Sequence, residues 1–203
     1  MTNNALIIFT RNPELGKCKT RLAKTLGDQS ALDIYKYLLQ HTANVAKKVQ
    51  TNRYVFYSVE INQNDIWSTN NFIKKLQKGH DLGERMHNAF NELLHLGHEK
   101  VVIIGSDLLD LNAELIEHAF QKLDHNDVVI GPAEDGGYYL LGMKSMQQDV
   151  FKNKAWGTET VREATIKNLQ NSNVYLLKEL NDIDTFDDMK HYDQLKPFYK
   201  TDD

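Results

Sequence analysis

Residues 101–110 read VVIIGSDLLD, and this stretch decides the fold. Four β-branched residues run directly into a glycine, a serine and an aspartate. A short apolar run that is bounded by a turn residue is typical of a buried parallel strand covered on both faces. In open α/β sheets, ligands bind outside the carboxyl ends of the strands. The stretch therefore predicts a strand that delivers Asp107 to a binding crevice, with Asp110 three residues further on.

Asp107 and Asp110 are the candidate metal ligands. Mg²⁺ and Mn²⁺ take oxygen ligands, and proteins usually hold them with one or two carboxylates plus the phosphates of a substrate. The alternative is that Asp107 only caps the helix that follows, as aspartates in strand-to-helix turns often do. The decapeptide alone leaves both interpretations open.

Length and composition bound the class of protein. The 203 residues are 41% hydrophobic and 26% charged, which predicts one globular domain over residues 1–203 with a well-buried core. No apolar run approaches the roughly 20 residues of a membrane span, and the N-terminus lacks a signal-peptide pattern. Together with the single cysteine, Cys18, this predicts a cytoplasmic protein. The net charge of −4 argues against a nucleic-acid-binding surface.

A basic loop follows the first predicted strand, residues 5–9. Between residues 11 and 24 the chain carries five basic residues against one acid, which favours a small anionic ligand over a polymer. A glycine permits close backbone approach to an anion, and basic side chains donate charge-assisted hydrogen bonds to it. No P-loop motif is present, and a solvated basic loop is the alternative. The candidate phosphate-binding residues of this loop are Arg11, Gly16, Lys17, Lys19 and Arg21.

Residues 131–142 read GPAEDGGYYLLG, where a predicted strand meets a glycine-rich bend with two acids before an aromatic strand resumes. This order predicts the wall of an active site. The alternative is a plain hairpin turn, because Asp-Gly is a strong hairpin signal. Glu134 and Asp135 are the candidates for orienting an acceptor or acting as a base. Gly136 and Gly137 join the candidates for nucleotide binding.

A second acid pair, Asp182 and Asp184, flanks Ile183 after the last predicted strand, residues 174–177. The alternation points both acids the same way. Thr185 and Asp188 fit a helix-capping pattern, which does not account for the pair. Two carboxylates near a bound diphosphate repel it unless a cation lies between them. We therefore expect Asp184 to lie beside Asp107 as a second metal or sugar contact, with a solvated pair as the alternative.

The remaining pattern alternates strands with helices. Apolar residues at helical spacing predict helices over 28–50, 82–96 and 158–169 and from residue 112, with Asp81 and Thr158 as N-caps. Further strands are expected at 53–59, 72–77 and 127–130, and a short helix within 60–71. Glu84 and Arg85 lie either on a solvated helix face or in contact with a ligand, and the sequence favours the first. This order predicts an α/β fold, a three-layer α/β/α sandwich with a mostly parallel central sheet.

Five motifs give the chain a resemblance to a known family over nearly its whole length. They are FTRNPELGKCKTRLAKTLG at 9–27, HDLGERM at 80–86, GSDLLDL at 105–111, GPAEDGGYYLLG at 131–142 and DIDTFDD at 182–188. With these motifs the chain resembles the glycosyltransferase-like bacterial family DUF2064. The KTRL and DIDT segments also look like parts of the guanylyltransferases that act on phospholactate and on molybdenum cofactor.

The resemblance implies a GT-A, or nucleotide-diphospho-sugar transferase, fold with a nucleotide site and bound Mg²⁺ or Mn²⁺. The family usually shows Gly-Ser/Thr-Asp-Cys-Pro-Asp where this chain has Gly-Ser-Asp-Leu-Leu-Asp. Both aspartates are present, so the family's metal role carries over to Asp107 and less directly to Asp110. The proline that shapes this turn in the family is absent here.

We therefore expect a metal-dependent glycosyltransferase that uses a nucleotide-diphosphate sugar. The departing nucleoside diphosphate gains negative charge, which a metal on Asp107 and the basic loop would offset. The alternative is a nucleotidyltransferase, in which a phosphate-bearing acceptor attacks a nucleoside triphosphate and pyrophosphate leaves. A non-catalytic nucleotide sensor is a third hypothesis, and the many carboxylates argue against it. The expected partners are a nucleotide or nucleotide sugar and an unidentified acceptor, with no nucleic acid; a homo-oligomer is left open.

Overall fold

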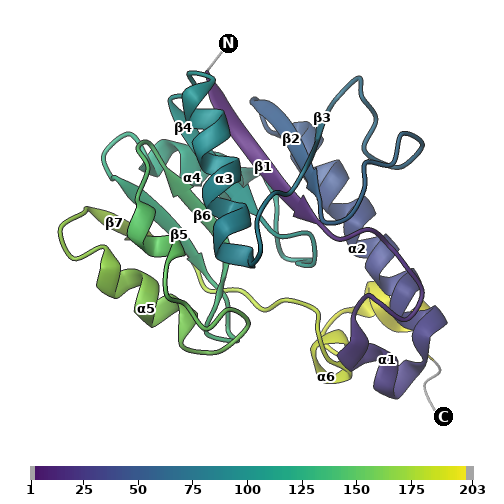
Figure 1. Ribbon diagram of the computed structural model, residues 1–203. Coiled ribbons are helices and arrows are strands. Elements are labelled where there is room, and N and C mark those ends of the chain that lie inside the picture. The colour runs from purple at the N-terminus through teal and green to yellow at the C-terminus, as the bar shows by residue number, and fades with distance from the viewer. Residues whose placement is uncertain (1–2, 200–203) are drawn as a thin grey trace.

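The computed structural model describes residues 3–199, and its seven strands form one sheet (Figure 1). The strand order is β3-β2-β1-β4-β6-β5-β7, in which only β6 of these described strands runs antiparallel to its neighbours. The bounds are β1 Asn4–Thr10, β2 Asn52–Tyr57, β3 Ile73–Leu76, β4 Lys100–Ile104, β5 Val128–Pro132, β6 Tyr138–Met143 and β7 Val174–Leu176. The mostly parallel central sheet is thereby confirmed.

Helices cover both faces of this sheet. The α-helices are α1 Thr20–Leu26, α2 Asp28–Lys48, α3 Leu82–His95, α4 Ala113–Lys122, α5 Val161–Asn168 and α6 Phe186–Met189, and 3₁₀ turns span Gln148–Phe151 and Asp193–Phe198. Buried residues of α2 and α4 pack on one face, while those of α3 and the first 3₁₀ turn pack on the other. The three-layer α/β/α architecture is confirmed. Within residues 3–199, no helix combines the length and apolar character that crossing a bilayer requires.

The central strands are β1 and β4, and both are buried on their two faces. Along β1, Leu6 and Ile8 join the core under α2 and α4, while Ala5 and Ile7 join the core under α3. Alternate residues of a strand point to opposite faces, so an unbroken apolar run is what a doubly covered strand requires. The run at 101–104 pairs in parallel register with β1, as predicted.

The strand order reverses at β1. The chain moves from β1 to β2 on one side, and later returns to place β4 on the other side. In a doubly wound sheet the crevice for a ligand opens at this point, outside the carboxyl ends of the two central strands. The segments that follow Thr10 and Ile104 therefore meet at the position where a ligand is expected.

A third cluster of buried residues lies beyond the sheet, where α1, α2 and α6 meet (Figure 1). Leu22 of α1 packs there with Leu109, Ile183 and Met189. The cluster joins the segment after β1 to the segment near the C-terminus.

Helix α1 is the element that the sequence did not predict, since the basic loop was expected to have no helix. Its N-cap residue is Lys19, which has a left-handed backbone (φ 48°, ψ 49°) and makes no side-chain capping bond. The usual start signal, a Ser, Thr, Asp or Asn with a capping hydrogen bond, is therefore missing. The buried position of Leu22 shows that packing on the third cluster stabilises this short helix.

Two local predictions are wrong. No helix forms within residues 58–72, where turns are held by Asp65, which accepts hydrogen bonds from Tyr57 Oη at 2.6 Å and Lys74 Nζ at 2.8 Å. Helix α5 begins at Val161 rather than after Thr158, whose hydroxyl donates to the Ala155 carbonyl instead of capping. Two other caps are confirmed: Asp81 caps α3, and Thr185 with Asp188 forms a capping box on α6.

Candidate active site

Two adjoining cavities open at the carboxyl ends of β1 and β4. The larger, of about 480 Å³, is called the polar compartment, and the smaller, of about 230 Å³, the apolar compartment. Phe9, Leu82, Gly105 and Asp107 line both. The other residues of the polar compartment are Thr10, Arg11, Cys18, Lys19, Thr20, Tyr35, Ser58, Gln77, Arg85, Ser106 and Asp184.

Lys19 places its ammonium group between two carboxylates of the polar compartment. Its Nζ lies 3.0 Å from Asp107 Oδ2 and 3.7 Å from Asp184 Oδ1, and the side chain is only 7% exposed. The left-handed backbone of a non-glycine residue costs about 1–2 kcal/mol. The surrounding structure therefore holds Lys19 in a strained conformation that buries its charge.

The pKa of Lys19 reflects two opposing effects. Burial disfavours the charged form, but the charges of Asp107, Asp184 and Asp182 outweigh it and raise the pKa above its usual value. Asp184 has a second cationic partner, because Arg21 Nη1 donates a hydrogen bond to its Oδ2 at 2.8 Å. The ammonium group of Lys19 therefore stays charged at neutral pH and is held between the two acids.

Arg11 and Arg85 bring two more cationic groups to the polar compartment. The Arg11 guanidinium donates to the Lys17 carbonyl at 2.8 Å, and its backbone N–H donates to the Tyr35 hydroxyl of α2 at 2.9 Å. Arg85 comes from the first turn of α3, and its Nε donates to the Gly79 carbonyl at 3.1 Å. Three basic side chains, two from the loop after β1 and one from α3, thus line one cavity.

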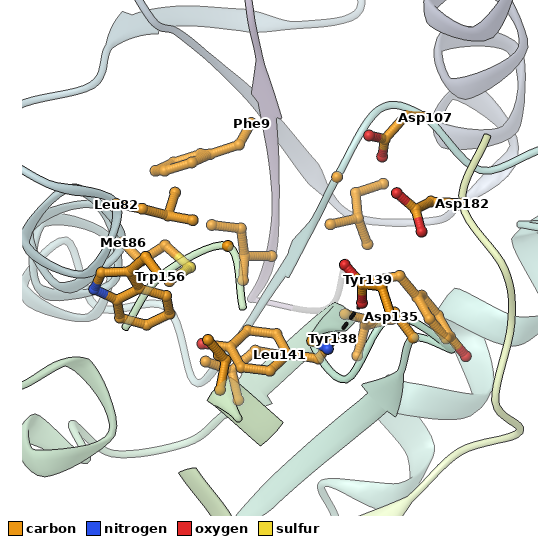
Figure 2. Close-up of a pocket in the computed structure, with 18 of the residues that line it drawn as sticks. Phe9, Leu82, Met86, Asp107, Asp135, Tyr138, Tyr139, Leu141, Trp156 and Asp182 are labelled. Atoms are coloured by element: carbon orange, nitrogen blue, oxygen red, sulfur yellow. Dashed lines mark hydrogen bonds between the residues drawn. The ribbon is translucent and has the colours of Figure 1, made fainter. Parts of the chain in front are cut away.

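The apolar compartment has an acidic side and an apolar side. Figure 2 shows Asp107, Asp135 and Asp182 on one side, with Phe9, Leu82, Met86 and Trp156 on the other. The apolar wall is closely packed, because a Cβ added to Gly83 of α3 would collide with the indole ring of Trp156. Besides the shared residues, this compartment is lined by Met86, Ile103, Ile104, Leu108, Ala133, Asp135, Gly137, Tyr138, Tyr139, Leu140, Leu141, Trp156, Gly157, Thr158, Val161 and Asp182.

Asp182 carries the most perturbed carboxyl group of this compartment. Burial raises its pKa to about 6, and the negative charges of Asp107 and Asp135 add to the effect, while Lys19 opposes it. Among residues 3–199, neither Asp135 nor Asp182 forms a salt bridge. Two acids without a counterion therefore face an apolar cavity.

The bend that carries Asp135 is a β-hairpin between β5 and β6, with a register shift at Gly131 and Pro132. Gly136 has φ +85°, and a Cβ on it would collide with the backbone of Glu159. Asp135 Oδ1 accepts a hydrogen bond from the Gly137 N–H at 2.8 Å. The hairpin interpretation and the active-site interpretation are thus compatible, because the same bend lines the cavity.

Comparison with known proteins places the chain in a family. The model of the bacterial family DUF2064, described as uncharacterized proteins conserved in bacteria, matches residues 41–158, which is more than half of the chain. The chain belongs to this family. The matched region carries Asp107 and Asp135, whereas Lys19, Asp182 and Asp184 lie outside it.

This DUF2064 chain is also similar to proteins with named activities. A proposed nucleotide-diphospho-sugar transferase from Desulfovibrio desulfuricans G20 is 32% identical, with 97% of this chain and 89% of that chain covered and a TM-score of 0.89. A 2-phospho-L-lactate guanylyltransferase from Methanocaldococcus vulcanius is 26% identical over 170 residues, which cover 81% of this chain and 73% of the relative.

A more distant solved structure shares the fold. The 4-diphosphocytidyl-2C-methyl-D-erythritol synthase of Anaerococcus prevotii is 12% identical, with 94% of each chain covered and a TM-score of 0.62. The nucleotide-diphospho-sugar transferase fold expected from the sequence motifs is thereby confirmed.

The structure of this DUF2064 chain brings about half of the sequence candidates to the two cavities. Arg11, Lys19, Asp107 and Asp184 line the polar compartment. Asp107 also lines the apolar compartment, together with Asp135 and Gly137. Asp107 does not cap the next helix, because Asn112 is the N-cap of α4 and accepts from the Leu115 N–H at 2.8 Å.

The other candidates lie outside both cavities. Lys17 pairs with Glu14 at 2.7 Å on the surface, and Arg21 reaches the site only through Asp184. Asp110 Oδ2 accepts a hydrogen bond from the Tyr192 hydroxyl at 2.8 Å. The cavity linings also exclude Gly16, Glu134 and Gly136.

Several lining residues escaped the sequence analysis. The sequence favoured a solvated helix face for Arg85 over a ligand contact, whereas the structure places Arg85 in the polar compartment with Gln77. The position of Arg85 could have been inferred from the sequence. Strand β3 is parallel to its neighbours and ends at Leu76, so the start of the next helix lies at the same carboxyl end of the sheet as the ends of β1 and β4. Met86 and Trp156 had no comparable signal.

The described residues contain no group of three or more His, Cys, Asp or Glu side chains arranged to hold a metal ion. The cation that lies between Asp107 and Asp184 is the ammonium group of Lys19. The sequence argument that such a pair makes sense only around a metal is therefore incomplete. The donor chemistry still suits Mg²⁺ or Mn²⁺, because both acids offer hard oxygen ligands and already accommodate positive charge between them.

Proposed function

We propose that this protein is a glycosyltransferase that uses a nucleotide-diphosphate sugar. The observation that carries the proposal is the buried ammonium group of Lys19, which shares a cavity with Arg11 and Arg85 at the carboxyl ends of the central strands. A preformed cluster of cationic donors at this place is what a bound diphosphate requires. The 32% identical relative from Desulfovibrio desulfuricans supports the donor class.

The residues of the polar compartment act on the leaving group. When the bond between the sugar and the diphosphate breaks, the nucleoside diphosphate gains negative charge. Lys19, Arg11 and Arg85 would donate charge-assisted hydrogen bonds to its oxygens. Without the donor, hydrogen bonds to backbone carbonyls hold the guanidinium groups of Arg11 and Arg85, and Asp107 holds the ammonium group of Lys19.

Asp107 and Asp184 would hold the divalent cation, Mg²⁺ or Mn²⁺, in the complex with the donor. Bound there, the ion would act as a Lewis acid that offsets the charge of the diphosphate. Lys19 would then exchange its contact with these acids for one with the phosphates. Asp135 and Asp182 line the adjoining compartment, and one of them would accept the proton of the acceptor hydroxyl.

Nucleotidyl transfer is the second candidate, and the guanylyltransferase relative, 26% identical over 81% of this chain, favours it. In that reaction an oxygen of the acceptor would attack the α-phosphorus of a nucleoside triphosphate, and pyrophosphate would leave. The same cationic cavity would serve, because the leaving group again gains negative charge.

The test is to incubate the protein with panels of nucleotide sugars and nucleoside triphosphates, with Mg²⁺, with Mn²⁺ or with EDTA. Mass spectrometry then identifies the product. Nucleoside diphosphate from a nucleotide sugar is the expected result, and pyrophosphate from a triphosphate would select nucleotidyl transfer. If neither product forms and calorimetry detects no nucleotide binding, the proposal fails.

Asp107→Asn and Asp110→Asn form a matched pair of variants. Asp107 lines both compartments, whereas Asp110 is bound to Tyr192 outside them. Turnover should fall about 100-fold in Asp107→Asn, because a ligand of the cation and the partner of Lys19 are lost together. Turnover in Asp110→Asn should stay within about twofold of the wild type.

A further inference from the structure

We infer that the apolar compartment binds the acceptor, and that this acceptor is an alcohol with an apolar body and no phosphate group. The inference rests on the proposed function, because it takes the polar compartment as the site of the nucleotide donor. It adds the chemical class of the second substrate, which decides what kind of bond the enzyme makes.

The position of the apolar compartment suits an acceptor. The two compartments share the wall formed by Phe9, Leu82, Gly105 and Asp107. A ligand in one compartment is therefore next to a ligand in the other, as group transfer between two substrates requires. Both sides of the apolar compartment border the polar compartment, through Asp107 on the acidic side and through Phe9 and Leu82 on the apolar side (Figure 2).

The charges of the apolar compartment exclude a phosphate. Of the described residues that line it, three are aspartates and none is lysine, arginine or histidine. Lys19 offsets the charge of Asp107, whereas Asp135 and Asp182 have no salt-bridge partner among residues 3–199. A phosphate monoester would meet these two carboxylates beside apolar walls, where water screens their charges poorly.

The same residues suit an uncharged alcohol. Ionised carboxylates only accept hydrogen bonds, so Asp135 and Asp182 need donors, and a hydroxyl group provides one. On the opposite side, Phe9, Met86 and Trp156 offer an apolar surface for the body of the ligand (Figure 2). A cavity of about 230 Å³ limits that body to a small ring system or a short branched chain. The hydroxyl would then lie on the side of Asp107, which also lines the polar compartment.

Two matched probes test the charge preference without any turnover. They are 4-fluorobenzyl alcohol and 4-fluorobenzyl phosphate, followed by ligand-observed fluorine NMR with the nucleotide-free protein in EDTA. We expect the alcohol to bind about tenfold more tightly than the phosphate ester, because only the ester carries charge into the acidic cavity. Equal or tighter binding of the ester, or no binding of either probe, would overturn the inference.

Variants locate the bound probe. Met86→Trp fills the cavity from α3 and should abolish binding of the alcohol, while leaving nucleotide affinity within about twofold. The double variant Asp135→Asn with Asp182→Asn keeps the shape and removes both charges, so it should remove most of the discrimination against the phosphate ester. Unchanged discrimination in the double variant would contradict the charge argument even if Met86→Trp does not fold.

The two proposals fail in different ways. A protein that binds the alcohol and no nucleotide would refute the proposed function, while the charge preference of the apolar compartment would stand. A protein that binds nucleotides but prefers the phosphate ester would refute the inference and would support nucleotidyl transfer to a phosphate-bearing acceptor instead.

Discussion

The polar and apolar compartments share a wall but differ in whether their acidic side chains have cationic partners. In the polar compartment each acid has a cationic partner, and Lys19 serves both Asp107 and Asp184. In the apolar compartment, Asp135 and Asp182 have no such partner among the described side chains. The difference teaches that the loops at one end of a sheet can place acids that have cationic partners next to acids that have none. Asp107 stands at the border of the two.

The largest combined effect on stability and nucleotide affinity is expected from Lys19→Met, which removes the central cation of the polar compartment. Two carboxylates, each about one third exposed, lose the ammonium group that offsets their repulsion. Unfolding free energy should fall by about 2 kcal/mol, a value reduced from that of a fully buried pair by solvent screening. Nucleotide affinity should fall about 100-fold with the loss of the charge-assisted bond. Urea unfolding and calorimetry measure the two effects.

Lys17→Met is the matched control from the same loop. Lys17 is 69% exposed and its ammonium group pairs with Glu14 on the surface, so its loss should leave the unfolding free energy close to that of the wild type. Added Mn²⁺ should restore part of the stability lost in Lys19→Met, because the freed acids offer oxygen ligands, and should not affect Lys17→Met. Equal effects of the two substitutions would show that Lys19 has no special role.

Gly136→Ala should disturb the apolar compartment alone. The new methyl group would collide with the backbone of Glu159, and φ +85° strains any L-residue. We expect a loss of about 2–3 kcal/mol, together with weaker binding of acceptor probes and unchanged nucleotide affinity. Gly157→Ala is the control, since it has φ +80° but open space around the new methyl group, so a loss of about 1 kcal/mol is expected. Similar losses in both variants would remove the collision from the explanation.

The smallest effect concerns Asp182→Asn and its dependence on pH. The pKa of Asp182 is raised from 3.8 to about 6, so the folded protein binds this proton more tightly than the unfolded chain does. The residue therefore stabilises the fold below its ordinary pKa, and this contribution is lost as the pH rises through 6. At pH 7.5 the variant should melt about 3 °C above the wild type, and at pH 4.5 the difference should shrink. Calorimetry in EDTA measures both, and a difference independent of pH would contradict the assignment.

Hydrophobic pattern predicted the sheet because it depends only on neighbouring residues. The run at 101–104 predicted a doubly covered strand, and a ligand contact for Asp107 at its carboxyl end was one of two interpretations, beside a helix cap. Helix α1 was not predicted, because its N-cap residue is a lysine with a left-handed backbone and its stability comes from packing with residues distant in the sequence. Local pattern carries no information on such packing.

The candidate site was predictable by position and not by pairing. Sequence reasoning assigned the basic loop to a ligand and the acids to a metal, whereas Lys19 pairs directly with Asp107 and Asp184. The contact between Lys19 and Asp107 joins residues 88 positions apart, and no repeat or motif spacing in the sequence predicts it. Trp156 reaches the apolar compartment from an irregular segment, which has no periodicity from which its direction could be inferred.

The third buried cluster, where α1 meets α6, has a consequence for the order in which the protein matures. Arg21 and Asp184 are joined across 163 positions of the chain, and Leu22 and Ile183 pack in the same cluster. A ribosome releases the N-terminal half long before residues 182–189 exist, so the emerging chain holds Lys19 with only one of its two acids. The residues that line the polar compartment therefore come together only after residues 182–189 have been synthesised.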